Sequence, residues 1–148
     1  ANKGLSILDF GLRFEGYTSD VTMSFVDNIL SQEQKTMIDL VEEAHRIAVE
    51  ACGPEVSLLK VATLVDEFFA KAGWFMPHSL GHGIGLDAHE LPTLSMRAMP
   101  DDLLLPGHIV TIEPGLYHPE LGGVRLENDV LITDTGAEVI THSRIVRL

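Results

Sequence analysis

The sequence predicts an α+β fold in which mostly antiparallel strands carry two helices on one face. Three observations support this class: paired strand-like segments lie within residues 5–26, two amphipathic segments lie within 31–73, and strand-like sequence returns within 108–141. The chain has 148 residues, of which 45% are hydrophobic, and this is enough to bury the core of one domain.

The first two segments, residues 5–14 and 17–26, are rich in Ile, Leu, Val, Phe, Tyr and Thr, which favour strands. Glu15 and Gly16 stand between them and are typical of a two-residue hairpin turn. The sequence therefore predicts an antiparallel hairpin.

Two helices follow the hairpin. Ser31 opens the first, with Gln34 three residues later as its capping-box partner, and Gly53-Pro54 ends it. Ser57 opens the second helix, which ends at Gly73. Both segments repeat apolar residues at helical spacing, so each is expected to lay one face on the sheet.

The second half of the chain is less regular. Residues 75–90 are rich in glycine and histidine and are not expected to be helical, and residues 91–107 form a predicted loop with three prolines. Residues 108–113 and 124–132 read as strands, and 138–141 as a short one.

The composition excludes whole classes of function. Twenty-two Asp and Glu against ten Lys and Arg give a net charge of −12, which disfavours binding to nucleic acid. No apolar run approaches the roughly 20 residues that cross a bilayer. The single cysteine, Cys52, excludes an internal disulfide and favours a reducing, cytoplasmic location. The acidic balance indicates either a solvated acidic surface or carboxylates gathered around cations.

Two aspartates interrupt the predicted hairpin, in strands where Asp is normally depleted. With Glu15 and Gly16 at the turn, Asp9 faces Thr22, and Asp20 becomes the diagonal neighbour of Asp9 on the same face, roughly 7–8 Å away. Two converging carboxylates repel each other unless a proton or a cation lies between them. The alternative is that both simply face solvent.

The segment PHSLGHGIGLDAHE carries three of the seven histidines. His78 and His82 have the spacing of a helical zinc pair, but three nearby glycines disfavour a helix. In an extended strand the two would lie roughly 13 Å apart, so at most one can bind a given metal. The other histidines of the segment, including His89, are then expected to contact substrate, unless they only pack in a loop.

A second acidic pair lies near the C-terminus. Glu113 ends one predicted strand and Glu127 lies inside the next, so a hairpin centred near Glu120 places them opposite each other. Like charges placed opposite destabilise a sheet unless something binds between them. Arg125 shares the face of Glu127, where it would pair with a carboxylate or bind substrate, and Asp129 could share that face too.

Five stretches, LDFG, GYTSDVT, HSLGHGIGLDAHE, TIEPGLY and GGVRLENDVLIT, together resemble the pita-bread metallopeptidases. Within that group the chain looks most like Xaa-Pro aminopeptidases and prolidases, over Leu5 to the C-terminus. The resemblance implies a curved antiparallel sheet with helices on its outer face.

The resemblance also implies five ligands for two divalent metal ions: Asp9, Asp20, His82, Glu113 and Glu127. Asp20 and Glu127 would bridge both metals. Four carboxylates and one imidazole suit Mn²⁺ best, with Co²⁺, Fe²⁺ or Zn²⁺ as alternatives. By the same resemblance, His78, His89 and Arg125 would act on the substrate side, where His89 would hydrogen-bond the scissile carbonyl or oxyanion.

The function implied is hydrolysis of Xaa-Pro peptide bonds through a metal-bridging hydroxide, on a peptide with Pro at its second position, with Glu113 shuttling the proton. The alternatives are a methionine-aminopeptidase-type enzyme, a metal-free creatinase-like hydrolase and an inactive peptidase-like binding module. Met23 stands where many members of the group have a basic residue.

The earlier half of the family's domain has no counterpart here. Residues 1–148 are therefore expected to be the C-terminal part of a catalytic domain, which forms a homo-oligomer or needs the missing N-terminal portion.

Overall fold

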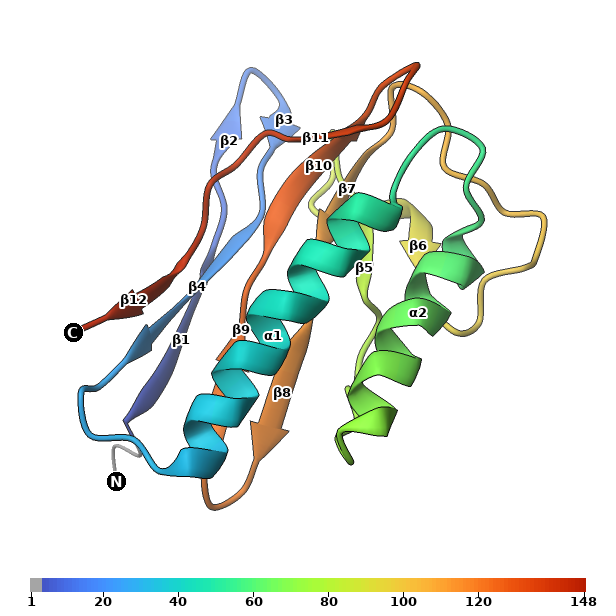
Figure 1. The fold of residues 1–148 in the computed structure, drawn as a ribbon. Helices are drawn as coiled ribbons and strands as arrows, with labels where there is room; N and C mark the ends of the chain where they lie inside the picture. The colour runs from blue at the N-terminus through green and yellow to red at the C-terminus, as the bar shows by residue number, and fades with distance from the viewer. Residues whose placement is uncertain (1–3) are drawn as a thin grey trace.

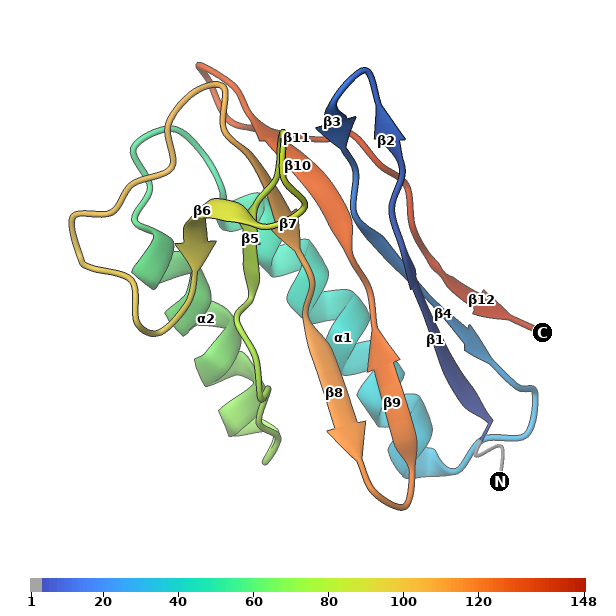
Figure 2. The ribbon, with the colours of Figure 1, turned by 180° about the vertical axis from the view of Figure 1, so that it is seen from behind.

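A computed structural model describes residues 4–148 and confirms the α+β class. In these residues the strands form a three-stranded sheet in the order β1-β4-β12, a five-stranded sheet in the order β11-β10-β7-β5-β6, and two short ribbons, β2-β3 and β8-β9. The helices α1 and α2 lie side by side on one face of the five-stranded sheet and the β8-β9 ribbon, and the three-stranded sheet lies beside them (Figure 1). The opposite face of the strands is left without a helix (Figure 2).

The predicted N-terminal hairpin is confirmed, with its register. Strand β1 (Leu5–Phe10) pairs antiparallel with β4 (Val21–Val26), and Asp9 stands opposite Thr22. Beyond them β2 (Arg13–Phe14) pairs with β3 (Tyr17–Thr18), and the turn residues Glu15 and Gly16 both have positive φ.

Each predicted strand of this hairpin is nevertheless interrupted, at residues 11–12 and 19–20. The two sides of the hairpin approach closely there, since a Cβ on Gly11 would lie 2.1 Å from the carbonyl oxygen of Ser19. The interruption gives Asp20 a position outside the regular ladder.

Both helices lie where the sequence predicts them. Helix α1 (Gln32–Ala51) begins with the complete capping box of Ser31 and Gln34. Helix α2 (Leu58–Lys71) begins after Ser57, although the Ser57 side chain makes no capping hydrogen bond. Their inner faces bury a core with the sheet, and neither described helix is long and apolar enough to cross a membrane.

The five-stranded sheet is built from β5 (Gly81–Gly83), β6 (Glu90–Leu94), β7 (Ile109–Ile112), β10 (Asn128–Ile132) and β11 (Ala137–Val139). Glycine is required at Gly81, where a Cβ would lie 1.8 Å from the carbonyl oxygen of Thr111. Strand β6 corrects the predicted loop over 91–107. Pro92 argued against a strand in this segment. A proline is nevertheless tolerated in β6 because this strand lies at the edge of the sheet.

Three further strands, β5, β8 and β12, were not predicted. Strand β8 (Gly115–His118) pairs with β9 (Gly122–Arg125), so the predicted strand 124–132 is in fact two strands separated at residues 126–127. Strand β12 (Ile145–Arg147) pairs parallel with β4, an exception to the antiparallel prediction. These strands are short and receive much of their stability from their neighbours rather than from their own sequence.

Strand β4 joins the two sheets beneath the site. Thr22 and Glu127 form an antiparallel bridge, and the Ser24 hydroxyl donates to the carbonyl oxygen of Arg125 at 2.8 Å. These contacts bring the end of the N-terminal hairpin against the strands that carry the second acidic pair.

Candidate metal centre

Four carboxylates and one imidazole converge on the helix-free face of the sheet. Ligand atoms within 4.8 Å of one another form two overlapping groups that share Glu127, and the members of these groups are Asp9, Asp20 and Glu127 in one and His82, Glu113 and Glu127 in the other. These are the five residues that the sequence brings forward as metal ligands.

Strand ends position these side chains. Asp9 lies near the end of β1, Asp20 just before β4, Glu113 just after β7 and Glu127 just before β10. The hairpin β7–β10 and the ribbon β8–β9 keep one register on both sides of the second acidic pair, as predicted from a hairpin centred near Glu120. Glu113 therefore lies between β7 and β8, and Glu127 lies between β9 and β10.

His82 is oriented as a ligand would be. Its Nδ1 lies 3.0 Å from the carbonyl oxygen of Gly83, so that nitrogen carries the proton and donates it. Its Nε2 points into the cluster, 3.6 Å from Oε1 of Glu113 and 3.8 Å from Oδ2 of Asp20. Burial lowers the pKa of His82, which keeps the ring neutral and leaves the Nε2 lone pair for a cation.

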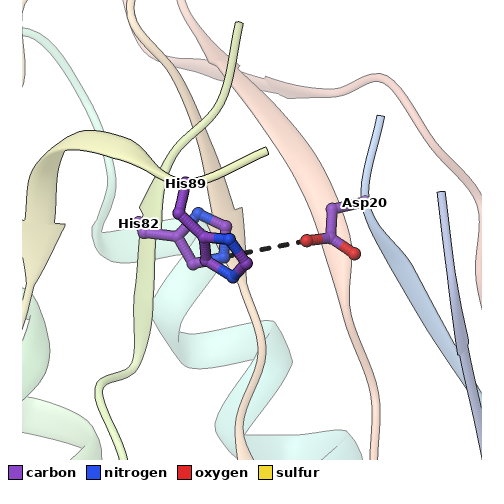
Figure 3. Close-up of side chains that lie close together, drawn as sticks. All are labelled: Asp20, His82 and His89. Atoms are coloured by element: carbon purple, nitrogen blue, oxygen red, sulfur yellow. Dashed lines mark ion pairs between the residues drawn. The ribbon is translucent and has the colours of Figure 1, made fainter. Parts of the chain in front are cut away.

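His89 lies beside the cluster as well. Figure 3 shows its ring overlapping that of His82, with both rings facing Asp20, and the ring centroids are 4.3 Å apart. Asp20, His82 and His89 themselves form a third group whose ligand atoms lie within 4.8 Å of one another. The geometry therefore brings the expected substrate-side histidine within reach of a metal.

In the second acidic pair Glu127 is buried and Glu113 is partly buried, and the pKa values of both carboxyl groups are raised. Burial raises the pKa of Glu113 to about 8, and the charge of Glu127 adds to the rise. Burial also raises the pKa of Glu127 to about 7, although Thr22 donates a hydrogen bond to its Oε2 at 2.5 Å. A divalent cation would replace these protons, so the donor set fits a metal centre.

Asp20 and Asp129 lie next to each other at the edge of the cluster. Burial raises the pKa of Asp20, and the neighbouring charge of Asp9 adds to this. The backbone N–H of Asp20 donates to Oδ2 of Asp129 at 3.3 Å, while the buried Oδ1 of Asp129 has no hydrogen-bond partner among residues 4–148. Asp129 therefore does approach the cluster, as its alternation with Glu127 suggested.

Arg125 pairs with a carboxylate, one of the two roles considered for it. Its guanidinium donates to Asp9, to the hydroxyl of Thr22 at 3.0 Å and to the hydroxyl of Tyr117 at 3.2 Å. Tyr117 in turn lies 2.9 Å from Nε2 of His78. Arg125 thus links the acidic cluster to the histidine expected to contact substrate.

His78 stays outside the ligand groups of the described residues, which agrees with the argument that His78 and His82 do not share a metal. Sequence reasoning missed the roles of Thr22 and Tyr117. The signal for Thr22 was present, because the predicted register places it opposite Asp9. Tyr117 carried no such signal, because the strand that holds it was not predicted.

An open pocket of about 500 Å³ adjoins the cluster. Its walls include three histidines and two glutamates, and its main lining residues are His78, His82, His89, Glu90, Leu91 and Glu113. A small peptide could enter this space and reach the converging carboxylates.

The comparisons with known proteins decide the family. The profile of metallopeptidase family M24 (Peptidase_M24) matches residues 1–134. The chain belongs to this family. A putative dipeptidase, YkvY, of Bacillus subtilis is 39% identical over 138 residues, which cover 92% of this chain and 38% of that protein. An Xaa-Pro dipeptidase of Pyrococcus furiosus is 38% identical and is covered over 40% of its length by 94% of this chain.

Solved structures show the same likeness and confirm the pita-bread fold. The prolidase of Pyrococcus horikoshii OT3 superposes with a TM-score of 0.90 at 35% identity, over 95% of this chain and 41% of that one. An X-Pro aminopeptidase of Thermotoga maritima gives a TM-score of 0.89 at 33% identity, over 97% of this chain and 41% of that one. The M24 chain described here thus spans about 40% of the length of these relatives.

Proposed function

We propose that residues 1–148 form the C-terminal part of the catalytic domain of a dinuclear metal-dependent exopeptidase that hydrolyses Xaa-Pro peptide bonds. One observation carries the proposal: two groups of ligand atoms share Glu127, as a pair of bridged cations requires. The proposal is supported by relatives that are Xaa-Pro dipeptidases and by structures of prolidases and an X-Pro aminopeptidase.

The proposed ligands are Asp9, Asp20, His82, Glu113 and Glu127. An oxygen-rich set with one imidazole favours Mn²⁺, with Co²⁺, Fe²⁺ or Zn²⁺ as alternatives. When bound, such a pair of ions activates water and polarises the scissile carbonyl.

The residues around the ligands would do the remaining work. Glu113, which lines the pocket beside the cluster, would take the proton of the attacking water and return it to the leaving amine. His89, exposed at the pocket, would donate a hydrogen bond to the oxygen of the scissile carbonyl. His78 would orient the peptide, and Arg125 would hold Asp9 in place.

The test is to purify the protein that contains this chain and to measure its bound metal together with its hydrolysis of peptides. About two divalent ions per chain are expected. A dipeptide and a longer peptide with Pro at the second position should both be tried, with a Met-Ala peptide as the comparison. Faster cleavage of the Met-Ala peptide would favour the methionine-aminopeptidase alternative, and peptide binding without metal or cleavage would favour a binding module.

We further propose that residues 1–148 alone self-associate or need a partner segment. Large apolar side chains are exposed at the tip of the N-terminal hairpin, with exposed fractions of 73% for Leu12, 76% for Phe14 and 64% for Tyr17. Strand β1 also lies at the edge of its sheet. The mass of the isolated chain in solution tests this, and a monomer with full proline-specific activity would contradict it.

A further inference from the structure

The tip of the N-terminal hairpin, residues 13–18, forms hydrogen bonds with the loop of residues 85–89, which carries His89. The backbone N–H of Thr18 donates to the carbonyl oxygen of Gly85 at 2.8 Å. The Thr18 hydroxyl lies 3.0 Å from that oxygen and 3.1 Å from the carbonyl oxygen of Asp87. From the paired strand, the guanidinium of Arg13 donates to the carbonyl oxygen of Leu86 at 3.0 Å.

Three consecutive carbonyl groups of the loop are therefore held by two residues of the hairpin: Thr18, through its backbone N–H and its hydroxyl, and Arg13. The loop has little else to fix it, because residues 86–89 are exposed. Its start is anchored by Ile84, which is buried and hydrogen-bonded to β7. Within the loop, the N–H of Asp87 donates to the carboxylate of Glu90 at 2.7 Å.

The same hairpin segment presents Asp20. Thr18 stands two residues before it, and Asp20 is itself tied to β10 through its backbone N–H and the carboxylate of Asp129. The contacts of Thr18 thus join the segment that bears Asp20 to the loop that bears His89. In Figure 3 the rings of His89 and His82 lie together on one side, and Asp20 lies opposite them.

We propose that Thr18, assisted by Arg13, is a positioning residue that sets His89 relative to His82 and Asp20. This inference rests on the proposed function, in which His89 hydrogen-bonds the scissile carbonyl. A donor must be placed to within a fraction of an ångström, since a misplacement of about 1 Å can cost about a hundredfold in rate. An exposed loop meets that demand only when it is fastened from outside.

The experiment uses substitutions at Thr18 in the protein that contains this chain. Thr18→Val removes the hydroxyl, keeps the shape and leaves the backbone contact to Gly85. We expect kcat to fall about tenfold while KM and bound metal stay near their original values, because only the placement of His89 changes. Thr18→Ser keeps the hydroxyl and should restore the rate. Thr36→Val is the matched control, because that hydroxyl donates only within α1, to the carbonyl oxygen of Gln32.

A double-mutant cycle identifies the route of the effect. If Thr18 acts through His89, Thr18→Val should change nothing further in a His89→Ala background. Additive losses, or loss of metal in Thr18→Val, would overturn the proposal. Wild-type kcat in Thr18→Val would overturn it as well.

Hydrogen exchange separates this proposal from the proposed function. Thr18→Val and Arg13→Gln should each speed amide exchange in residues 85–89, whereas Thr36→Val should not. If the protein has no peptidase activity but exchange in the loop still becomes faster in these variants, the proposed function is refuted and the positioning role of Thr18 and Arg13 is supported. If the protein is active but exchange in the loop is unchanged in both variants, the positioning role is refuted and the proposed function is supported.

Discussion

The site is assembled from two acidic hairpins with opposite surroundings. In the N-terminal hairpin, the side chain of Asp9 is 53% exposed and pairs with Arg125. In the second, Glu127 is only 2% exposed, and its carboxylate is met by the hydroxyl of Thr22. Both hairpins bring two carboxylates together, yet Asp9 is well exposed and forms a direct ion pair with Arg125, whereas Glu127 is buried and feels that arginine only at longer range.

This difference indicates which hairpin depends on a cation. Exposed charge is screened by solvent, whereas a buried carboxylate pair must keep a proton or bind a metal. The raised pKa values of Glu113 and Glu127 express that dependence. The predictions below test the contrast from its largest expected effect to its smallest.

The largest effect is expected for Glu127→Ala, which removes the residue common to both ligand groups. We expect loss of bound metal and a rate below about a thousandth of the original. Metal content and peptide hydrolysis should be measured on the same preparation, with the exposed Glu138→Ala as the control. Normal metal content and rate in Glu127→Ala would refute the assignment.

His89→Ala should keep its metal and lose turnover. Loss of one hydrogen bond to a developing oxyanion lowers the rate by roughly 10²–10³. The measurement is kcat together with metal stoichiometry. If metal is lost while peptide affinity is unchanged, the group of Asp20, His82 and His89 is itself a ligand set.

Asp9→Asn probes the exposed hairpin and should be milder than Glu127→Ala. The asparagine keeps one oxygen ligand, and water reaches this side of the cluster. We expect a rate about ten to a hundred times lower, a range that also describes loss of a supporting metal-site contact. Added metal should recover part of the activity, and a loss as complete as that of Glu127→Ala would mean that exposure does not matter here.

The smallest effect concerns the stability of the metal-free protein. Its folded state holds protons on Glu113 and Glu127 up to pKa values of about 8 and about 7, whereas the ordinary value is 4.5. This contribution to the unfolding free energy is complete below about pH 4.5 and is lost as the pH rises through 7 and 8.

Melting temperatures measured from pH 5 to pH 9, with a chelator or with Mn²⁺, test whether the metal-free protein loses stability as the pH rises. The Glu113→Gln variant should lose less stability than the parent chain across that range. His45 provides an internal contrast, because burial lowers its pKa to about 4 and its contribution is lost as the pH falls below 6.5. Equal slopes for Glu113→Gln and the parent chain would contradict the prediction.

The sequence was most informative where strand-like alternation and a recognisable turn occur together. The alternation around Glu15 and Gly16 correctly predicted the pairing of Asp9 with Thr22. The symmetry around Glu120 did the same for the second acidic pair. Two hairpin registers were enough to predict two pairs of converging carboxylates.

The contacts that support the site were harder to predict. Arg125, Tyr117 and His78 meet across segments whose pairing depends on the whole sheet. Strands β5, β6, β8 and β12 were missed because each is short. In some of them glycine or proline interrupts the pattern, and in others the neighbouring strand supplies the pairing. Local sequence therefore indicated which carboxylates converge but not the network of contacts around them.

The contacts of Tyr117 have a direction. Nδ1 of His78 lies 2.8 Å from the carbonyl oxygen of Ser79, so it must carry the proton. Burial lowers the pKa of His78, and the neutral ring then has a bare Nε2 that accepts from Tyr117, whose oxygen accepts from Arg125. Both ring nitrogens of His78 are thereby used, and a peptide N–H can donate to the bare Nε2 only after the tyrosine hydroxyl turns away. If the proposed function holds, an incoming peptide therefore competes with Tyr117 for this nitrogen.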